Sequence, residues 1–444
     1  MPMNVLFVSL GCDKNLVDSE HMLGDLIDHG YTICDDEADA DIIVVNTCSF
    51  IADAMEESIQ NIIDLGSYKE NGKLKALIVT GCLAQRFTEN ILEDLPEVDA
   101  IIGTNSYDEL VKAIDEVLEK KGYLPVYKKE LTGLPKDGRR VLTTGGHYAY
   151  LKIAEGCNKR CTYCIIPYIR GDYRSVPMER ILEEAKQLAE DGVKELILVA
   201  QETTVYGMDI YGHKSLPELL NKLCEIDGIN WIRILYAYPE EITDELIECM
   251  ANQPKICHYI DMPIQHCNDE LLRKMGRKTD KADIMNIAAK LRAAMPDISL
   301  RTTLICGFPG ETEEMHEELL QFIKDMKFDR LGAFAYSKED GTVAATWDNQ
   351  VDEELKQKWQ EEVMLCQKDI SLANNKNYIG KTLPVFIEGK LPEDGVFVGR
   401  TYRDTPSVDG FIFVNSDTEL TSGQFVQVTV TSFDEYDLIG DVKL

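Results

Sequence analysis

Short apolar runs alternate with amphipathic stretches over residues 3–119. The runs VLFVSLGC, DIIVVNTC, ALIVTGC and AIIGT are each followed by a stretch with helical spacing, such as DSEHMLGDLIDHG or ADAMEESIQNIIDLG. A strand that is buried on both faces is a continuous apolar run, and strands that alternate with helices are typical of a parallel sheet. The pattern predicts an N-terminal doubly wound α/β domain over residues 3–119.

A second strand–helix series extends over residues 143–373. Its apolar runs are YAYLKIA, LILVA, WIRILYA, YIDMP, LRTTLIC and RLGAFAY, separated by amphipathic stretches such as MERILEEAKQLAEDG. Six βα units are too few for an eight-fold barrel but follow the same design, so we expect a partial (βα)6 TIM-like barrel. Residues 120–142, between the two series, are polar and basic and contain Pro and Gly. We interpret them as a linker or an edge hairpin.

The pattern changes again over residues 376–444. Short alternating runs (TLPVFIEG, GVFVGRT, GFIFVN and QFVQVTVTS) replace the helical spacing. They predict a small five-stranded, OB-like β-barrel. Such barrels often bind RNA, but from residue 378 onward 11 acidic residues stand against 5 basic ones. This balance disfavours a polyanion at the barrel.

Three cysteines occupy equivalent places in the first series. Cys12, Cys48 and Cys82 each follow the end of an apolar strand. The carboxyl ends of parallel strands meet at one edge of a sheet, where ligands bind. A single buried Cys is usually a small hydrophobic residue. Three at matching strand ends predict a shared metal site.

A second cysteine set lies in the stretch EGCNKRCTYCIIPYIRG. Cys157, Cys161 and Cys164 follow the first strand of the predicted barrel, and barrel enzymes keep their chemistry at that face. A structural zinc site takes four protein ligands, and so does a 4Fe–4S cluster that only carries electrons. No fourth Cys or His follows closely. Either a distant residue completes the site, or one metal position is left open.

The composition limits the partners and the compartment. The net charge is −32, from 46 basic and 78 acidic residues, so a basic protein partner fits better than a nucleic acid. The longest apolar runs are strand-sized and the N-terminus lacks a basic leader, which predicts a cytoplasmic protein without a membrane span. Thiols stay reduced there, so thirteen cysteines favour metal sites over disulfides.

Seven further cysteines show no ligand spacing. We expect core or incidental positions for Cys34, Cys224, Cys249, Cys257, Cys267, Cys306 and Cys366.

The strings SLGCDKNLVDSE, NTCSFI, TGCLAQR, AEGCNKRCTYC, GFPGET and YSKEDGT appear in this order along the chain. Together they resemble the radical S-adenosylmethionine (SAM) methylthiotransferase family, whose members combine an N-terminal three-Cys domain, a radical core and a C-terminal TRAM barrel. The resemblance covers the whole chain. It implies a transferase that uses SAM both as methyl donor and as radical source.

The resemblance also implies ligand sets. Cys157, Cys161 and Cys164 would hold the 4Fe–4S cluster that cleaves SAM, and Cys12, Cys48 and Cys82 a second 4Fe–4S cluster with one open iron. Gln201 and Glu202, in AQET, would contact the methionyl amine of SAM. Gly307 and Gly310, in the GFPGET turn, would contact its adenosyl part. Catalytic residues beyond the cluster ligands stay unknown. A low-potential electron donor such as flavodoxin or ferredoxin is also implied.

Two branches of the family differ in substrate. The strings SLGCDKN, YAYLKIAEGC, IPYIRG, PIQHCN and EYDLIG resemble the branch that modifies the β-carbon of an aspartate in the small-subunit ribosomal protein S-twelve. One departure is AQET, where Glu202 replaces the expected Asp. His266 is a candidate substrate contact, although a lone His is more often structural. The alternative is methylthiolation of an adenosine in transfer RNA, and a remote one is a zinc-binding interaction protein.

Overall fold

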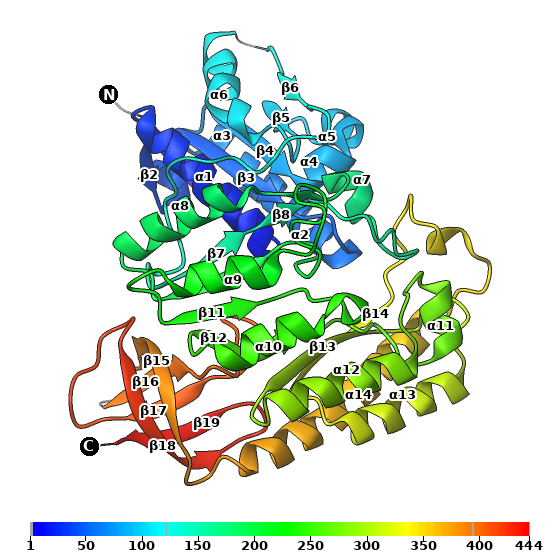
Figure 1. Cartoon of the computed structure of the whole chain (residues 1–444). Coiled ribbons are helices and arrows are strands. Elements are labelled where there is room, and N and C mark those ends of the chain that lie inside the picture. The colour runs from blue at the N-terminus through cyan, green and yellow to red at the C-terminus, as the bar shows by residue number, and fades with distance from the viewer. Residues whose placement is uncertain (1–2, 121, 393–394, 444) are drawn as a thin grey trace.

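The structure is a computed structural model that describes residues 3–120, 122–392 and 395–443. Two parallel sheets and a closed barrel form its three parts (Figure 1). Residue 121 of the predicted linker and residues 393–394 and 444 of the predicted C-terminal domain lie outside the described residues. Within the part that is described, the helices are too short or too polar to cross a membrane.

The first sheet is parallel throughout, with the strand order β2-β1-β3-β4-β5-β6. Its strands are β1 (Asn4–Ser9), β2 (Thr32–Cys34), β3 (Ile42–Thr47), β4 (Ala76–Gly81), β5 (Ala100–Ile102) and β6 (Val126–Tyr127). Its helices are α1 (Asp13–Asp28), α2 (Ala52–Gly66), α3 (Tyr68–Asn71), α4 (Cys82–Arg86), α5 (Thr88–Asp94) and α6 (Leu110–Glu119).

Alternation along β3 shows why this sheet is doubly wound. Ile42 and Val44 pack with α1 and α6 on one face, and Ile43 and Val45 pack with α2 and α5 on the other. Both faces are therefore buried, which explains the unbroken apolar run. The predicted doubly wound domain is confirmed.

The described residues of segment 120–142 do not form the edge hairpin that was one of the two expectations. Val126–Tyr127 forms β6, which pairs parallel to β5, whereas a hairpin would pair antiparallel. The chain then follows α1: the amide of Val141 donates to the carbonyl of Glu20, and Arg139 forms an ion pair with Asp28. Residues 139–141, near the end of this segment, therefore lie along α1.

The second sheet is also parallel, with the order β14-β13-β12-β11-β10-β7. Its strands are β7 (Tyr148–Lys152), β10 (Glu195–Val199), β11 (Trp231–Ile234), β12 (Ile256–Asp261), β13 (Ser299–Cys306) and β14 (Arg330–Ala335), and β8 (Ala154–Glu155) pairs with β9 (Arg174–Ser175) beside it. The helices are α7 (Ile166–Arg170), α8 (Met178–Glu190), α9 (Leu216–Cys224), α10 (Asp244–Asn252), α11 (Asp269–Lys274), α12 (Lys281–Ala294), α13 (Glu313–Met326) and α14 (Glu353–Lys376). The six predicted strands are all present.

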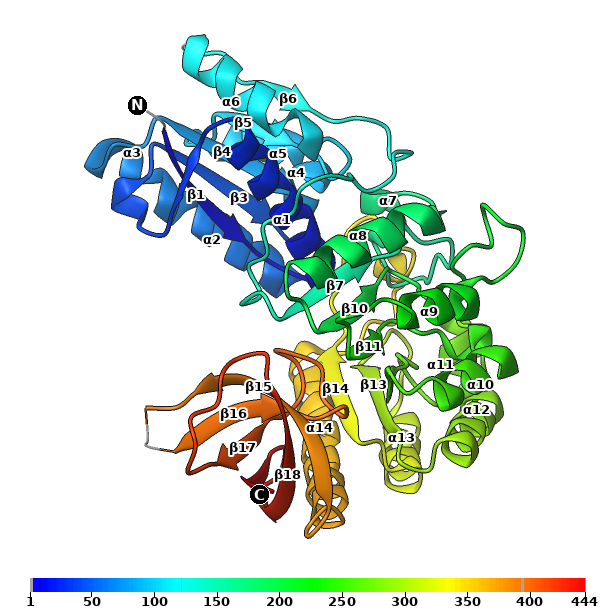
Figure 2. The ribbon, with the colours of Figure 1, turned by 60° about the vertical axis from the view of Figure 1, so that its left-hand side comes forward.

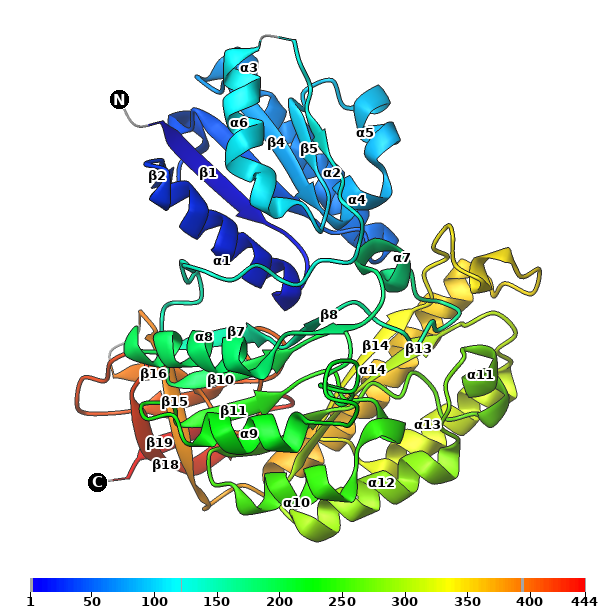
Figure 3. The ribbon, with the colours of Figure 1, turned by 45° about the horizontal axis from the view of Figure 1, so that its top comes forward.

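The two faces of this second sheet have different coverings. Large helices including α8, α9, α10 and α12 pack on one face (Figure 2). On the other face, Leu16 and Val17 of α1 pack with Tyr150 and Val199. Helix α1 thus lies between the two parallel sheets (Figure 3). It is shared by both cores and joins them.

The C-terminal barrel is closed in the order β15-β16-β17-β19-β18. Its strands are β15 (Thr382–Lys390), β16 (Val396–Arg400), β17 (Ile412–Asn415), β18 (Phe425–Phe433) and β19 (Leu438–Val442). It docks near the amino ends of the second sheet: Arg400 donates to Glu195 at the start of β10, and Asp404 accepts from Arg330 at the start of β14. The predicted five-stranded barrel is confirmed, and it lies away from the carboxyl ends of the strands.

Candidate active site

Cys12, Cys48 and Cys82 follow β1, β3 and β4, which are neighbours in the first sheet. The strand order reverses between β1 and β3, and ligands of open α/β sheets bind at that point, outside the carboxyl ends. Glycines let the loops approach. A Cβ on Gly11, whose φ is +87°, would lie 2.7 Å from Cys48 Cβ. The predicted position at three strand ends is confirmed.

Asn15 connects the three loops. Its Nδ2 donates to the carbonyl of Leu10 at 3.1 Å and to that of Thr47 at 2.9 Å. Leu10 lies two residues before Cys12, and Thr47 lies directly before Cys48. Its Oδ1 lies 3.8 Å from Cys82 Sγ. One buried amide therefore sets the spacing of the loops. Burial raises the pKa of Cys48 to about 12 and raises that of Cys82.

The second set lies at the carboxyl end of the other sheet. Cys157 and Cys161 are buried, and the loop is held by backbone bonds from Cys157 to Gly171 and from Thr162 to Met275. Burial raises the pKa of Cys157 to about 11. Buried thiols with raised pKa values stay neutral until a metal replaces their protons.

No group of three His, Cys, Asp or Glu side chains among the described residues is close enough to hold a single metal ion. In a cuboidal cluster each thiolate bonds a different iron, so that ligand set is wider than the set around one ion. Sulfur donors are what such a cluster takes, and each set supplies three. Both sets fit a cluster in the chemistry of their donors.

Gln201 and Glu202 follow β10 beside the Cys157–Cys164 loop. Among the described residues, Gln201 Oε1 and Glu202 Oε2 are buried without a hydrogen-bond partner. Burial raises the pKa of Glu202 to about 7, while Thr204 and Lys159 oppose the shift. A buried polar atom without a hydrogen-bond partner calls for an explanation, and a bound polar ligand is one. Glu202 Oε2 already has Lys159 Nζ at 3.8 Å. The predicted contact of the pair with the amine of SAM stays a prediction.

Gly307 and Gly310 lie in the turn after β13, with φ values of +74° and +87°. A Cβ on Gly307 would overlap the Lys356 side chain, and one on Gly310 would overlap the Asn349 side chain. Packing inside the protein therefore already requires both glycines. Their predicted contact with the adenosyl group is not tested by this packing.

His266 is fully buried behind the same turn. Its Nδ1 accepts from the amide of Asn268 at 3.0 Å, and its Nε2 lies 3.3 Å from Glu311 Oε1. Glu311 in turn accepts from the amides of Gly307 and Phe308. This geometry makes His266 a support for the turn, and its predicted substrate contact stays a prediction.

The remaining cysteines lie apart from both sets in the chain, and all thirteen are free. Cys267 and Cys306, close to strand ends, are fully buried in the main core of the second sheet, and burial raises the pKa of Cys267 to about 12. They pack as apolar side chains.

Sequence reasoning missed a buried ionic group that joins the two cysteine sets. Arg170, at the end of α7, lies 2.7 Å from Asp18 and 3.4 Å from Glu155. Lys152 contacts the same two carboxylates. Burial would raise the pKa of Glu155, but Lys152 and Arg170 hold it at about 2. The only signal was position: Asp18 and Glu155 lie in the quoted strings around Cys12 and Cys157.

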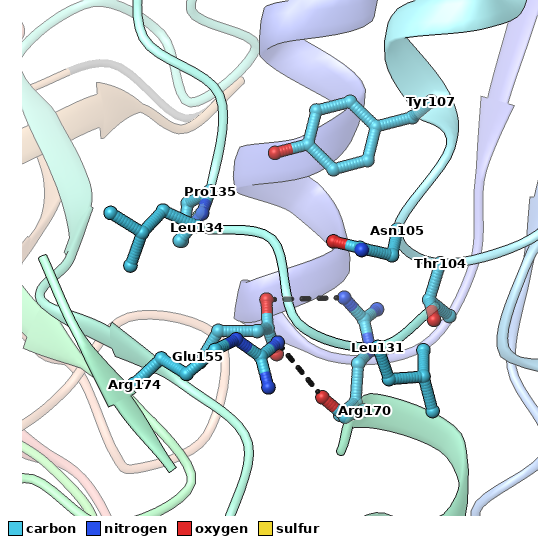
Figure 4. A pocket seen from close by; sticks show the side chains of 9 residues that line it. All are labelled: Thr104, Asn105, Tyr107, Leu131, Leu134, Pro135, Glu155, Arg170 and Arg174. Carbon is cyan, nitrogen blue, oxygen red and sulfur yellow. Dashed lines mark hydrogen bonds and ion pairs between the residues drawn. The ribbon is translucent and has the colours of Figure 1, made fainter. Parts of the chain in front are cut away.

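A small cavity with room for about one water molecule lies against this group (Figure 4). Glu155, Arg170 and Arg174 point toward it from the radical core, and Asn105 and Tyr107 from the N-terminal domain. The fold and site define a radical SAM enzyme: a three-Cys loop follows the first strand of a parallel partial barrel, and Cys82 of a second three-Cys set packs with Ile165 and Ile169 just after that loop.

Comparison with known proteins agrees with this class. Residues 151–323 match the Radical SAM superfamily, residues 4–103 match the uncharacterized protein family UPF0004, and residues 379–442 match the TRAM domain. A ribosomal protein uS12 methylthiotransferase RimO of Lachnoclostridium phytofermentans is 58% identical over 99% of this chain and 100% of its own length. Proteins of the same name from Thermoanaerobacter sp. and Clostridioides difficile are each 48% identical, over 99% of both chains. The chain belongs to the RimO family of radical SAM methylthiotransferases.

Solved structures support the fold. The methyltransferase TsrM of Kitasatospora setae, with tryptophan and a SAM analog, superposes with a TM-score of 0.54 at 16% identity, over 74% of this chain and 72% of that one. OxsB, a cobalamin-dependent SAM radical enzyme, gives 0.54 at 14% identity, over 82% and 56%. Membership of the superfamily implies SAM and a 4Fe–4S cluster as cofactors.

Proposed function

We propose that this chain methylthiolates the β-carbon of an aspartate in uS12, the small-subunit ribosomal protein S-twelve, with SAM as methyl donor and as radical source. The observation that carries the proposal is the meeting of the two cysteine sets: Cys82 packs with Ile165 and Ile169, just after the Cys157–Cys164 loop. A sulfur-bearing site and a radical-forming site thus lie on two sides of one interface.

The proposal includes two 4Fe–4S clusters. Cys157, Cys161 and Cys164 would hold the radical cluster, and Cys12, Cys48 and Cys82 the second one. When bound, the clusters and SAM supply the electron, the carbon radical and the methylthio group. Domain boundaries at 3–119, 143–373 and 376–444 are part of the proposal.

The chain's own residues orient SAM and keep water away from it. Glu202 Oε2, which has no hydrogen-bond partner and lies 3.8 Å from Lys159 Nζ, would accept the methionyl ammonium, and Gln201 Oε1 would accept a second N–H. Gln201 is held for this by its own Nε2, which donates to Glu155. The turn with Gly307 and Gly310, supported by Glu311, would receive the adenosyl group. Glu202, Gly307 and Glu311 are buried and Gln201 and Gly310 are half-buried, so water competes little for hydrogen bonds at this place.

Charge favours a protein substrate over a nucleic acid. Of the five basic residues from 378 onward, Arg400 and Arg403 are fully buried against the core. Lys390 is paired with Glu419. The TRAM barrel therefore presents few free cations for phosphates. Ribosomal proteins are strongly basic, and a chain with a net charge of −32 attracts them. Because ribosomal proteins are made in the cytoplasm, the proposed substrate places the reaction there.

The test offers both substrates at once. The chain is reconstituted without oxygen and given SAM, sulfide and a low-potential donor such as flavodoxin, together with uS12 and transfer RNA. Mass spectrometry should find a methylthio increment on an aspartate of uS12 alone. Cys82→Ser should abolish the increment while deoxyadenosine is still formed. An increment on the RNA alone would contradict the proposal in favour of the transfer RNA branch.

A further inference from the structure

The guanidinium of Arg170 forms a fork between the two cysteine sets. Its Nη1 donates to Asp18 at 2.7 Å, and its Nη2 donates to Asn15 and lies 3.6 Å from Cys82 Sγ. The side chain is 3% exposed. An arginine fixed by two partners in this way holds its N–H at a set angle toward the third, the sulfur.

The residues that accept hydrogen bonds from Arg170 are also held in place. Asn15 Oδ1 accepts from Arg170, while its Nδ2 is used up by the carbonyls of Leu10 and Thr47. Asp18 lies one helical turn further along α1 and also accepts from Lys152. Helix α1 therefore presents both anchors, and Arg170 cannot rotate away from Cys82 without breaking two buried hydrogen bonds.

The same guanidinium reaches the SAM side. Arg170 Nη1 lies 3.4 Å from Glu155 Oε2, and Glu155 Oε1 accepts from Gln201 Nε2 at 2.7 Å. An unbroken series of buried polar contacts thus extends from Cys82 through Arg170 and Glu155 to Gln201. Each end is a candidate contact of a different cofactor.

Hydrogen bonds to the ligating sulfurs help set the reduction potential of an iron–sulfur cluster. A cationic N–H donor stabilises the reduced, more negative state, so it raises the potential. We infer that Arg170 is a positioning residue that donates to Sγ of Cys82 when this sulfur is a cluster ligand, raises the reduction potential of the N-terminal cluster, and ties that cluster to the SAM site through Glu155. The inference rests on the proposed function, because it requires the second cluster.

The test uses the full-length chain with Cys157, Cys161 and Cys164 replaced by Ala, so that only the N-terminal cluster remains. Iron content and the midpoint potential are measured in this parent and in Arg170→Met. The expected result is unchanged iron and a lower midpoint potential. Arg140→Met is the matched control, because Arg140 joins Glu20 of α1 to Glu184 of α8, is also buried, and has no contact with a cysteine. It should leave the midpoint unchanged.

An Arg170→Met midpoint equal to that of the parent, or an equal shift in Arg140→Met, would overturn the inference. If Arg170→Met fails to load iron, Arg170→Lys is measured in its place. The single ammonium of Lys cannot hold Asp18 and Cys82 together, so the midpoint potential of this variant should also fall below that of the parent. An unchanged midpoint potential would likewise overturn the inference. A parent that binds no iron would instead refute the second cluster, and with it the proposed function.

Discussion

Gln201 Nε2 donates a 2.7 Å hydrogen bond to Glu155 Oε1, and Lys152 Nζ lies 3.0 Å from the other oxygen of the same carboxylate. Glu155 and Asp18 are the two carboxylates that balance the buried cations Lys152 and Arg170. Glu155→Gln leaves one positive charge in excess, and breaking a buried pair from one side costs about 3–5 kcal/mol. Urea denaturation of the cofactor-free chain should show this loss. Glu218→Gln, in an exposed pair with Lys222, is the control and should leave the midpoint unchanged.

Protonation of Glu155 should reduce the stability of the folded chain at acid pH. The pKa of Glu155 is about 2 in the folded chain, below its ordinary value of 4.5, so its contribution is fully present above about pH 4.5 and is lost as the pH falls toward 2. The stability of the unsubstituted chain should therefore fall over this range by more than that of Glu155→Gln. Parallel curves for the two proteins would contradict the prediction.

The pKa of Glu202 is shifted in the direction opposite to that of Glu155. Its pKa is raised to about 7, so the folded chain holds a proton that the unfolded chain loses above about pH 4.5. Stability of the cofactor-free protein should fall from about pH 4.5 to 7, and Glu202→Gln should remove this decline. SAM affinity of the reconstituted chain should rise with pH through about 7, because only the carboxylate attracts the ammonium. Equilibrium dialysis checks this, and an equal pH dependence in Glu202→Gln would count against the contact.

Gly307→Ala should displace the turn after β13. Alanine at a left-handed φ costs about 1–2 kcal/mol, and here its Cβ would also meet Lys356, with 2.9 Å to Lys356 Cβ. Gly212→Ala isolates the backbone cost, because Gly212 has a φ of +79° and no atom within 4 Å of the added Cβ. Denaturation should show a larger loss for Gly307→Ala, and SAM binding should weaken in that variant alone. Equal losses would show that the packing against Lys356 is unimportant.

Salt should weaken the action on uS12. If a chain with a net charge of −32 attracts a basic substrate, the KM for uS12 should rise as salt is raised, while kcat changes little. Initial rates at several salt concentrations check this prediction. A KM that is independent of salt would mean that the acidic surface plays no part in substrate capture.

The strand ends that carry Cys12, Cys48 and Cys82 could be predicted because each follows an apolar run, fully buried in β3 and β4 and partly buried in β1. Strands β2 and β6 could not, since Thr32–Cys34 and Val126–Tyr127 are short and are held by pairing at the sheet edges. The local pattern of apolar and polar residues does not predict such pairing.

The link through Arg170 was equally hidden. Arg170 meets Asn15, 155 residues earlier, only because α1 packs between the two sheets. Nothing in IPYIRG or DKN distinguishes a buried partner from a solvated charge. The docking of Arg400 on Glu195, 205 residues apart, has the same origin. Spacing predicts which residues share one strand end, whereas the contacts between domains depend on how separate cores pack.

The central claim is that two sets of three thiols hold separate clusters at one interface, and iron content tests it most directly. The reconstituted chain should bind about eight iron atoms, and replacement of either set by Ala should leave about four. Cys12→Ala/Cys48→Ala/Cys82→Ala should keep SAM cleavage, and the variant without Cys157, Cys161 and Cys164 should lose it. About four iron atoms in the unsubstituted chain, unchanged when the N-terminal set is removed, would contradict the account.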